Sequence, residues 1–223
     1  MVQWVYERAQ GAKRIREVII ATDDERICQA ATDFGAKAEM TSLDLASGTD
    51  RVAEVAARHS EFEIVLNVQG DEPLISPQVL DAVAEPLMQD SALPIATAIT
   101  RLAQMDDLQN SNVVKVVMNH KRNALYFSRA PIPFYRSRAD FREGSRMALP
   151  YRHLGIYGYQ RQALLELAHL EPSPLEQAEQ LEQLRFLEAG FTIRCVEVTA
   201  YGPGVDCPED IPRVEAILNQ EIG

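Results

Sequence analysis

A short apolar run that ends in two carboxylates constrains the fold of this chain more than any other feature. Residues 64–66 read Ile-Val-Leu, and residues 67–73 continue as Asn-Val-Gln-Gly-Asp-Glu-Pro. A run this short that stops at Gly and Pro is typical of a buried strand in a sheet covered by helices. Gly70 lets a ligand approach the backbone closely, and Pro73 ends the strand ladder. Because open α/β sheets bind ligands at the carboxyl ends of their strands, the sequence predicts a binding edge here.

Asp71 in this turn is a candidate metal ligand. A carboxylate at a strand end suits Mg²⁺, which binds one or two carboxylates together with the phosphates of a substrate. The alternative is a turn whose acidic residues are only solvated, since charged residues are common in turns. A second acidic turn, Gly-Val-Asp at 204–206, also follows a predicted strand. This placement would let Asp71 and Asp206 meet at one metal.

Composition narrows the class of protein and of partner. A length of 223 residues fits one α/β domain with room for a small extra lobe. The net charge of −11, without a basic stripe, argues against nucleic acid or an anionic membrane as a partner. Cys28, Cys195 and Cys207 form no CxxC pair, so neither a disulfide framework nor a zinc site is indicated. No apolar stretch approaches about 18 residues and no signal peptide is recognised, so we expect a cytoplasmic protein.

Hydrophobic periodicity predicts an α/β fold in which helices and short strands alternate. The expected helices lie at residues 2–11, 24–34, from 47 onward, 77–90, 161–169, 174–189 and after 208. The expected strands lie at residues 17–23, 37–40, 64–66, 94–100, 113–118, 124–131, 151–159 and 192–197. The turn-prone residues 119–123 join two of these strands into a hairpin, so the second half should carry antiparallel pairing. Residues 132–150 have no pattern and are expected to form a lid or to be disordered.

Residues 47–51, Ser-Gly-Thr-Asp-Arg, mark the start of a helix. Ser47 and Asp50 have the spacing of a capping box, which is the ordinary interpretation. A Ser-Gly-Thr turn at a helix N-terminus also directs free N–H groups at any anion that binds there. The chain contains neither a Gly-x-Gly-x-x-Gly nor a P-loop pattern, which disfavours a dinucleotide dehydrogenase or a P-loop enzyme.

Taken together, six motifs resemble those of the 3-deoxy-manno-octulosonate cytidylyltransferases, or CMP-Kdo synthetases. They occur in the family's order over nearly the whole chain, at residues 47–51, 67–73, 124–129, 152–159, 181–185 and 204–206. The resemblance implies transfer of a cytidylyl group from CTP to the sugar acid Kdo (3-deoxy-D-manno-octulosonate), with release of pyrophosphate, for lipopolysaccharide assembly. It also implies Mg²⁺ as cofactor and a homodimer.

The resemblance further implies a nucleotidyltransferase-type three-layer sandwich with a mixed, mainly parallel sheet. One domain would span residues 1–223, and about 113–160 would supply a smaller antiparallel portion for dimerisation. The family's metal carboxylates fall on Asp71 and Asp206, and Arg51 is carried over as a third catalytic residue. The substrate-binding residues that it implies are Ser47, Gly48 and Gln69 on the nucleotide side, and Arg51, His153, Tyr157, Glu182 and Gln183 on the sugar side.

These implied roles fit the residue types. A guanidinium such as that of Arg51 can bind the carboxylate of a sugar acid through two hydrogen bonds. His153 can position the sugar or accept a proton, although from the residues alone a half-buried, hydrogen-bonding histidine is the more ordinary interpretation. Glu182 and Gln183 likewise have the spacing of a solvated helix face. Only the resemblance makes these two residues candidate ligands for sugar hydroxyls.

The chain departs from the family's pattern at two places. Leu45 stands where the family commonly has His. The family also has a strand and a phosphate-binding loop ahead of its first helix, whereas this chain begins inside that helix. We therefore expect Met1 to be an internal residue of a longer protein, and the strands at 17–22 and 64–68 each to lack one partner. Two alternatives follow: a catalytically impaired fragment that only binds ligand or dimerises, or a related cytidylyltransferase for another sugar acid, such as a sialic acid.

Overall fold

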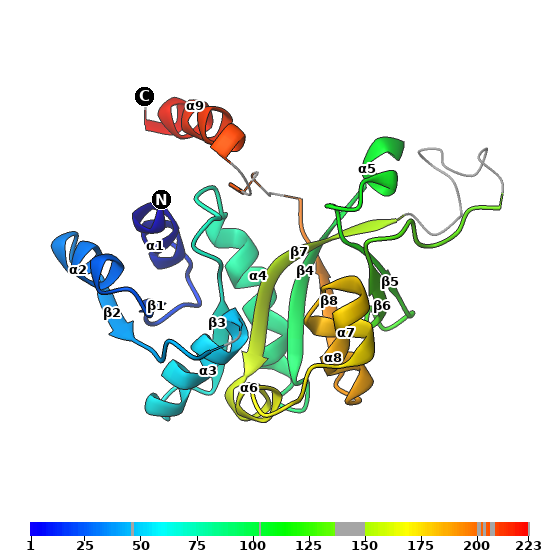
Figure 1. Ribbon diagram of the computed structural model, residues 1–223, viewed down its shortest axis with the longest axis horizontal. Helices are drawn as coiled ribbons and strands as arrows, with labels where there is room; N and C mark the ends of the chain where they lie inside the picture. The colour runs from blue at the N-terminus through cyan, green and yellow to red at the C-terminus, as the bar shows by residue number, and fades with distance from the viewer. Residues whose placement is uncertain are drawn as a thin grey trace.

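The chain folds into a mixed six-stranded sheet with a separate two-stranded sheet beside it (Figure 1). The computed structural model describes residues 1–45, 47–102, 104–136, 150–199, 202, 204–205 and 208–222. The strands are β1 (Ile19–Thr22), β2 (Lys37–Met40), β3 (Ile64–Asn67), β4 (Ile95–Arg101), β5 (Lys115–Met118), β6 (Ala124–Ser128), β7 (Tyr151–Gln160) and β8 (Ile193–Glu197). The helices are α1 (Val2–Gln10), α2 (Glu25–Asp33), α3 (Gly48–Arg58), α4 (Pro77–Gln89), α5 (Met105–Gln109), α6 (Arg161–Leu167), α7 (Pro174–Glu179), α8 (Gln183–Glu188), the 3₁₀ turn η2 (Pro208–Asp210) and α9 (Ile211–Ile222).

The long strand β7 organises the larger sheet. It pairs antiparallel with β3, β4 and β5, so these three strands run in the same direction. β8 pairs in parallel with β4 and therefore shares that direction. The expected mixed α/β fold is confirmed, although most neighbouring strands are antiparallel because β7 lies between β3 and β4.

Helices cover both faces of this sheet, which gives three layers. Along β4, Ile95 and Ile99 enter a core formed with α3, α6 and α8. Ala96 and Ala98 enter a second core, formed with α1 and α4 on the opposite face. Because alternate residues of a strand point to opposite faces, this pattern shows that β4 is buried on both faces of the sheet.

The predicted hairpin is present as β5 and β6. The two strands pair antiparallel, and their turn is closed by a hydrogen bond from the N–H of Asn119 to the carbonyl of Asn123 at 2.9 Å. Residues 132–136 lie outside regular secondary structure. Residues 137–149 lie outside the described part, so the expected lid stays a prediction.

The single helix predicted at 174–189 is wrong, because the structure divides it into α7 and α8. Gln180 adopts a left-handed conformation, with φ 53° and ψ 49°, and caps α7. The break turns the chain so that Leu181, 6% exposed, enters the core. Neither Gly nor Pro marks this break in the sequence, so the apolar periodicity predicted one uninterrupted helix.

The two sheets are not joined by strand pairing. Within the described residues, β1 pairs only with β2, and β3 pairs only with β7. Each therefore has one open edge, as expected for the strands at 17–22 and 64–68. Figure 1 shows β1 and β2 on the side of β3 away from β4.

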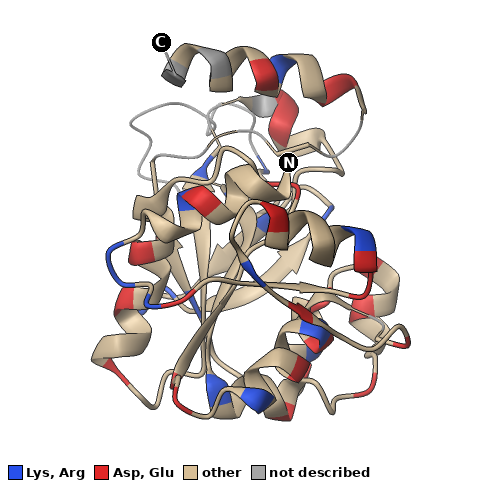
Figure 2. Ribbon diagram, turned by 90° about the vertical axis from the view of Figure 1, so that its left-hand side faces the viewer, with Lys and Arg blue, Asp and Glu red and all other residues tan. Residues whose placement is uncertain are grey.

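The surface is mixed in charge. Figure 2 shows acidic and basic residues interspersed over the helices. Among the helices that the structure describes, none is long and apolar enough to cross a membrane.

Candidate active site

The start of α3 lies where the carboxyl ends of β1 and β2 meet. Ser47 caps the helix by accepting a hydrogen bond from the N–H of Asp50 at 3.1 Å, as predicted. One turn later, Arg51 pairs with Asp23 at 2.7 Å and donates to the hydroxyl of Thr41. The guanidinium of Arg51 is thus held by its own chain, and its implied contact with a sugar carboxylate stays a prediction.

The end of β3 lies against the same helix start. A Cβ built on Gly48 would lie 3.6 Å from Nε2 of Gln69, so Gly48 and Gln69 are neighbours. Gln69 in turn donates to Oδ1 of the buried Asn67 at 3.3 Å. The structure thus brings together Ser47, Gly48 and Gln69, the residues implied for the nucleotide. The free N–H groups at the start of α3 make this edge suitable for phosphate.

The two acidic turns also lie side by side. The N–H of Val205 donates to the carbonyl oxygen of Asp71 at 2.9 Å, and a Cβ on Gly204 would lie 3.2 Å from the carboxyl carbon of Glu72. Asp71 is exposed, whereas Asp206, the residue after Val205, lies outside the described residues. The described residues hold no group of three or more His, Cys, Asp or Glu arranged for a metal. An exposed carboxylate beside a second acidic turn nevertheless fits Mg²⁺, which needs only one or two carboxylates from the protein.

His153 on β7 is buried and hydrogen-bonded. The hydroxyl of Thr97 donates to the carbonyl of Ile156 at 2.8 Å, so it accepts from Nε2 of His153, 2.9 Å away. Burial, together with the charge of Arg152, lowers the pKa of His153 to about 3. At neutral pH the ring is therefore uncharged, which favours a hydrogen-bonding role over that of a general base.

Buried polar atoms without partners gather next to His153. The ring of Tyr157 lies 5.2 Å from that of His153 and is stacked on Tyr159 at 5.9 Å. Among the described residues, the hydroxyl of Tyr157 and Nε2 of Gln183 are buried without a hydrogen-bond partner. Burial raises the pKa of Tyr157 well above its usual value, with Tyr159 and Glu182 adding to the shift. Buried polar groups are nearly always satisfied, so this cluster indicates a polar ligand.

Glu182 is another residue implied for the sugar, and it is hydrogen-bonded to α3. One carboxylate oxygen accepts from the hydroxyl of Thr49 at 2.6 Å, and the other accepts from Nη2 of Arg185 at 2.7 Å. Gln183 is 5% exposed and Arg185 is 7% exposed, so this stretch is not the solvated face that its spacing suggested.

Sequence reasoning did not single out Thr49, Tyr159 and Arg185. All three lie within the motifs that carry the family resemblance, which is the only signal that pointed to them. Each is buried, and the hydroxyl of Thr49 bonds to a residue 133 positions away. A contact between residues so far apart in the chain leaves no pattern in the local sequence from which it could be predicted.

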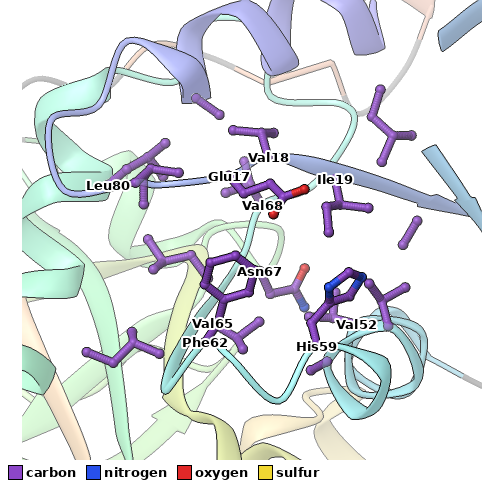
Figure 3. A pocket seen from close by; sticks show the side chains of 18 of the residues that line it. Glu17, Val18, Ile19, Val52, His59, Phe62, Val65, Asn67, Val68 and Leu80 are labelled. Carbon is purple, nitrogen blue, oxygen red and sulfur yellow. The ribbon is translucent and has the colours of Figure 1, made fainter. Parts of the chain in front are cut away.

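A large cavity separates the open edges of β1 and β3 (Figure 3). Its volume is about 740 Å³, and we call it the slot. Its lining is mostly apolar and comes from both strands and three helices, as with Val5 of α1, Ile19 of β1, Val52 of α3, Val65 of β3 and Leu80 of α4. At one end it reaches the site itself, since Gly48, Arg51, Gln69 and Gly70 also line it.

Comparison with known proteins places the chain in a family. A family model described as Cytidylyltransferase matches residues 1–195. A 3-deoxy-manno-octulosonate cytidylyltransferase of Geotalea daltonii is 49% identical over 218 residues, which is 96% of this chain and 86% of the relative. The protein of the same name from Myxococcus xanthus is 45% identical, over 100% of this chain and 87% of the relative.

Solved structures agree with this placement. A structure of CMP:2-keto-3-deoxy-manno-octonic acid synthetase complexed with CTP matches with a TM-score of 0.91 and 44% identity, covering 99% of this chain and 88% of that one. A cytidylyltransferase from Leptospira borgpetersenii has a TM-score of 0.60 at 13% identity and shows the fold alone. Together with the convergence of the motif residues at one edge, these matches show that the chain belongs to the cytidylyltransferase family.

Proposed function

We propose that this protein transfers a cytidylyl group from CTP to Kdo, giving CMP-Kdo and pyrophosphate for lipopolysaccharide biosynthesis. The observation that carries the proposal is the hydrogen bond between Thr49 and Glu182. It joins the helix start expected to bind phosphate to the buried polar cluster expected to bind the sugar. Two substrates placed on either side of this contact would meet at one point, as group transfer requires.

The residues divide between the two substrates. Ser47, Gly48 and Gln69 would hold the nucleotide, with the helix start of α3 facing its phosphates. The sugar hydroxyls would pair with the partnerless atoms of Tyr157 and Gln183, which a polyhydroxylated ligand can satisfy. Glu182 would accept a hydrogen bond from a further sugar hydroxyl. The uncharged ring of His153 would help to orient the sugar. Arg51 would bind the sugar carboxylate by exchanging its pair with Asp23.

In the reaction, the anomeric oxygen of Kdo attacks the α-phosphorus of CTP. The bond between that phosphorus and the oxygen bridging to the β-phosphorus breaks, pyrophosphate leaves with the electron pair, and the hydroxyl proton is released. Asp71 and Asp206 would hold Mg²⁺, which when bound neutralises phosphate charge and is worth several kcal/mol. The protein's part is to hold the two reacting atoms in line.

A homodimer in the cytoplasm is part of the proposal. Its support is the edge strand β6, where Leu125 is 60% exposed, and the nearby Phe134, which is 88% exposed. Exposed apolar side chains on an edge strand fit an interface with a second copy. Sedimentation of the protein and of its Leu125→Lys variant tests this: we expect a dimer for the parent and a monomer for the variant. A parent that sediments as a monomer would contradict it.

We further propose that the slot accommodates an extended strand in the working enzyme. The ends of β1 and β3 lie at the same helix start, since Asp23 contacts Arg51 and Gln69 lies beside Gly48. The two strands are therefore parallel, and a third strand between them would pair with both. Helix α3 lies on one side of the slot and α1 and α4 on the other, so a strand there would be apolar on both faces.

The experiment that tests activity measures pyrophosphate release from CTP, Kdo and Mg²⁺. We expect release only when all three are present, because Mg²⁺ neutralises charge on the phosphates and Kdo supplies the attacking oxygen. Release at the same rate without Kdo, or no release with it, would contradict the proposed reaction.

A cytidylyltransferase for another sugar acid is the alternative. The same assay with a panel of sugar acids, including a sialic acid, separates the two. Release of pyrophosphate with sialic acid but not with Kdo would overturn the proposed substrate. Binding of CTP or Kdo without any release would instead indicate a protein that only binds.

A further inference from the structure

Thr49 occupies an unusual place for a threonine in the first turn of a helix. It is 2% exposed, whereas residues at a capped helix start are ordinarily in contact with water. The helix cap is already supplied by Ser47, so the hydroxyl of Thr49 is not needed there. Its single hydrogen-bond donor is directed at Oε2 of Glu182, 2.6 Å away.

The other oxygen of Glu182 is fixed from the opposite side. Nη2 of Arg185 donates to Oε1 at 2.7 Å. Arg185 is itself held, because Nη1 donates to the carbonyl of Leu170 at 2.9 Å and the guanidinium lies 3.5 Å from Glu176. With one donor on each oxygen, the carboxylate of Glu182 cannot rotate without losing a charge-assisted hydrogen bond.

The two hydrogen bonds that fix Glu182 lie next in the chain to residues of both predicted substrate sites. Glu182 immediately precedes Gln183, whose Nε2 is buried without a partner in the described structure. Thr49 immediately follows Gly48, which neighbours Gln69 on the nucleotide side. The side chain of Thr49 thus contacts Glu182, and its chain neighbour Gly48 lies beside Gln69.

We infer that Thr49 is a positioning residue, which fixes the carboxylate of Glu182 for sugar binding. The inference rests on the proposed function, since it takes Glu182 as a ligand of the sugar. Without the hydroxyl, Oε2 of Glu182 loses its donor. Arg185 then holds only Oε1, so the carboxylate can rotate about that one remaining hydrogen bond. A hydrogen bond to a charged group contributes about 1.5–3 kcal/mol, so its loss corresponds to about 10-fold to 150-fold in affinity.

The test compares Thr49→Val, which removes the hydroxyl and keeps the shape, with Thr49→Ser, which keeps the hydroxyl. Thr32→Val is the matched control, because Thr32 is an exposed helical threonine whose hydroxyl bonds only to the carbonyl of Cys28. Binding of Kdo and of CTP to each variant is measured by calorimetry. We expect Thr49→Val to weaken Kdo at least 10-fold and CTP less than 2-fold, and the other two variants to match the parent.

Three results would overturn the inference: unchanged Kdo affinity in Thr49→Val, an equal loss of CTP affinity, or a Thr49→Ser variant as weak as Thr49→Val. A parent chain that binds CTP but not Kdo would overturn the proposed sugar substrate itself. In that case the contact is still tested by unfolding in denaturant, where Thr49→Val and Glu182→Gln should be non-additive. Additive effects would show that the contact does not fix Glu182.

Discussion

The N–H of Val205 donates to the carbonyl oxygen of Asp71 at 2.9 Å, which locks the turn after β8 onto the turn after β3. The two turns are far apart in sequence, and Asp71 is the residue whose carbonyl accepts this bond. The bond uses only backbone atoms, so the side chain of Asp71 is left to face solvent. This separation of roles means that the side chain can be changed without loosening the turn.

We therefore predict that Asp71→Ala abolishes Mg²⁺-dependent pyrophosphate release while the free energy of unfolding stays within about 0.5 kcal/mol of the parent. The measurement is release as a function of Mg²⁺ concentration, together with a denaturant melt. Asp106→Ala, which removes an exposed carboxylate from α5, is the control and should behave as the parent. An unchanged Mg²⁺ dependence in Asp71→Ala would refute its assignment as a metal ligand.

We predict that burial of His153 lowers the free energy of unfolding in acid. Its pKa falls to about 3 in the folded chain because it is buried, while the unfolded chain retains an ordinary value near 6.5. Between these two values the unfolded state binds the proton and the folded state does not. The free energy of unfolding should therefore fall as pH drops below about 6.5, by up to about 1.4 kcal/mol per unit, with no effect above that pH.

The variant His153→Asn should have a smaller slope of unfolding free energy between pH 6 and 4 than the parent. His120→Asn, in the exposed hairpin turn, should keep the parent slope. Hydrogen bonds to Glu61 and Glu39 raise the pKa of His59, and this stabilises the fold at low pH. The contribution of His59 is the same in the parent and both variants, so it does not affect their comparison. Equal slopes in parent and His153→Asn would contradict the prediction.

We predict that replacing Gln183 has opposite effects on the stability of the fold and on the binding of Kdo. Its Nε2 is buried without a partner among the described residues, which costs free energy in the ligand-free chain. Gln183→Met has similar volume and removes that cost, so we expect an equal or higher melting temperature and loss of Kdo binding. Gln177→Met, at an exposed position on α7, should change neither. A melting temperature several degrees below the parent would mean that Gln183 serves the fold.

Gly158 predicts a steric effect at the contact between β7 and α4. A Cβ at this position would lie 2.7 Å from Cδ1 of Leu87 and 3.1 Å from Cγ1 of Val83. Gly158→Ala should therefore destabilise the fold by about 1–3 kcal/mol in a denaturant melt. Gly155→Ala lies in the same strand with nothing within 4 Å of its Cβ, and should have little effect. Similar losses in both variants would point to strand flexibility as the cause.

Local pattern was enough to predict most elements of the fold. β3 and the helix capped by Ser47 follow from short-range periodicity and capping, and the hairpin follows from its turn residues. The break at Gln180 was missed, because a left-handed residue other than Gly or Asn has no reliable local signal.

The site could be predicted only in part. The proximity of residues within a single turn, such as Ser47 and Gly48, could be predicted because they are contiguous in sequence. The burial of Gln183 and Arg185 was missed, since helical spacing alone assigns polar residues to the solvated face. The contact between Thr49 and Glu182 depends on the packing of α3 against the segment before α8, and no local rule predicts it.

The slot also has a consequence for how the chain opens. Hydrogen bonds between strands couple neighbouring elements into one cooperative unit, and none crosses from β1 to β3 in the described residues. The sheet of β1 and β2 is attached to the remainder through contacts such as those of α3 with β1 and with β3. Its amides should exchange with deuterium by sub-global opening, at a lower free energy than those of β4 and β7. We therefore expect the sheet of β1 and β2 to behave as a separate foldon, which opens while the six-stranded sheet stays intact.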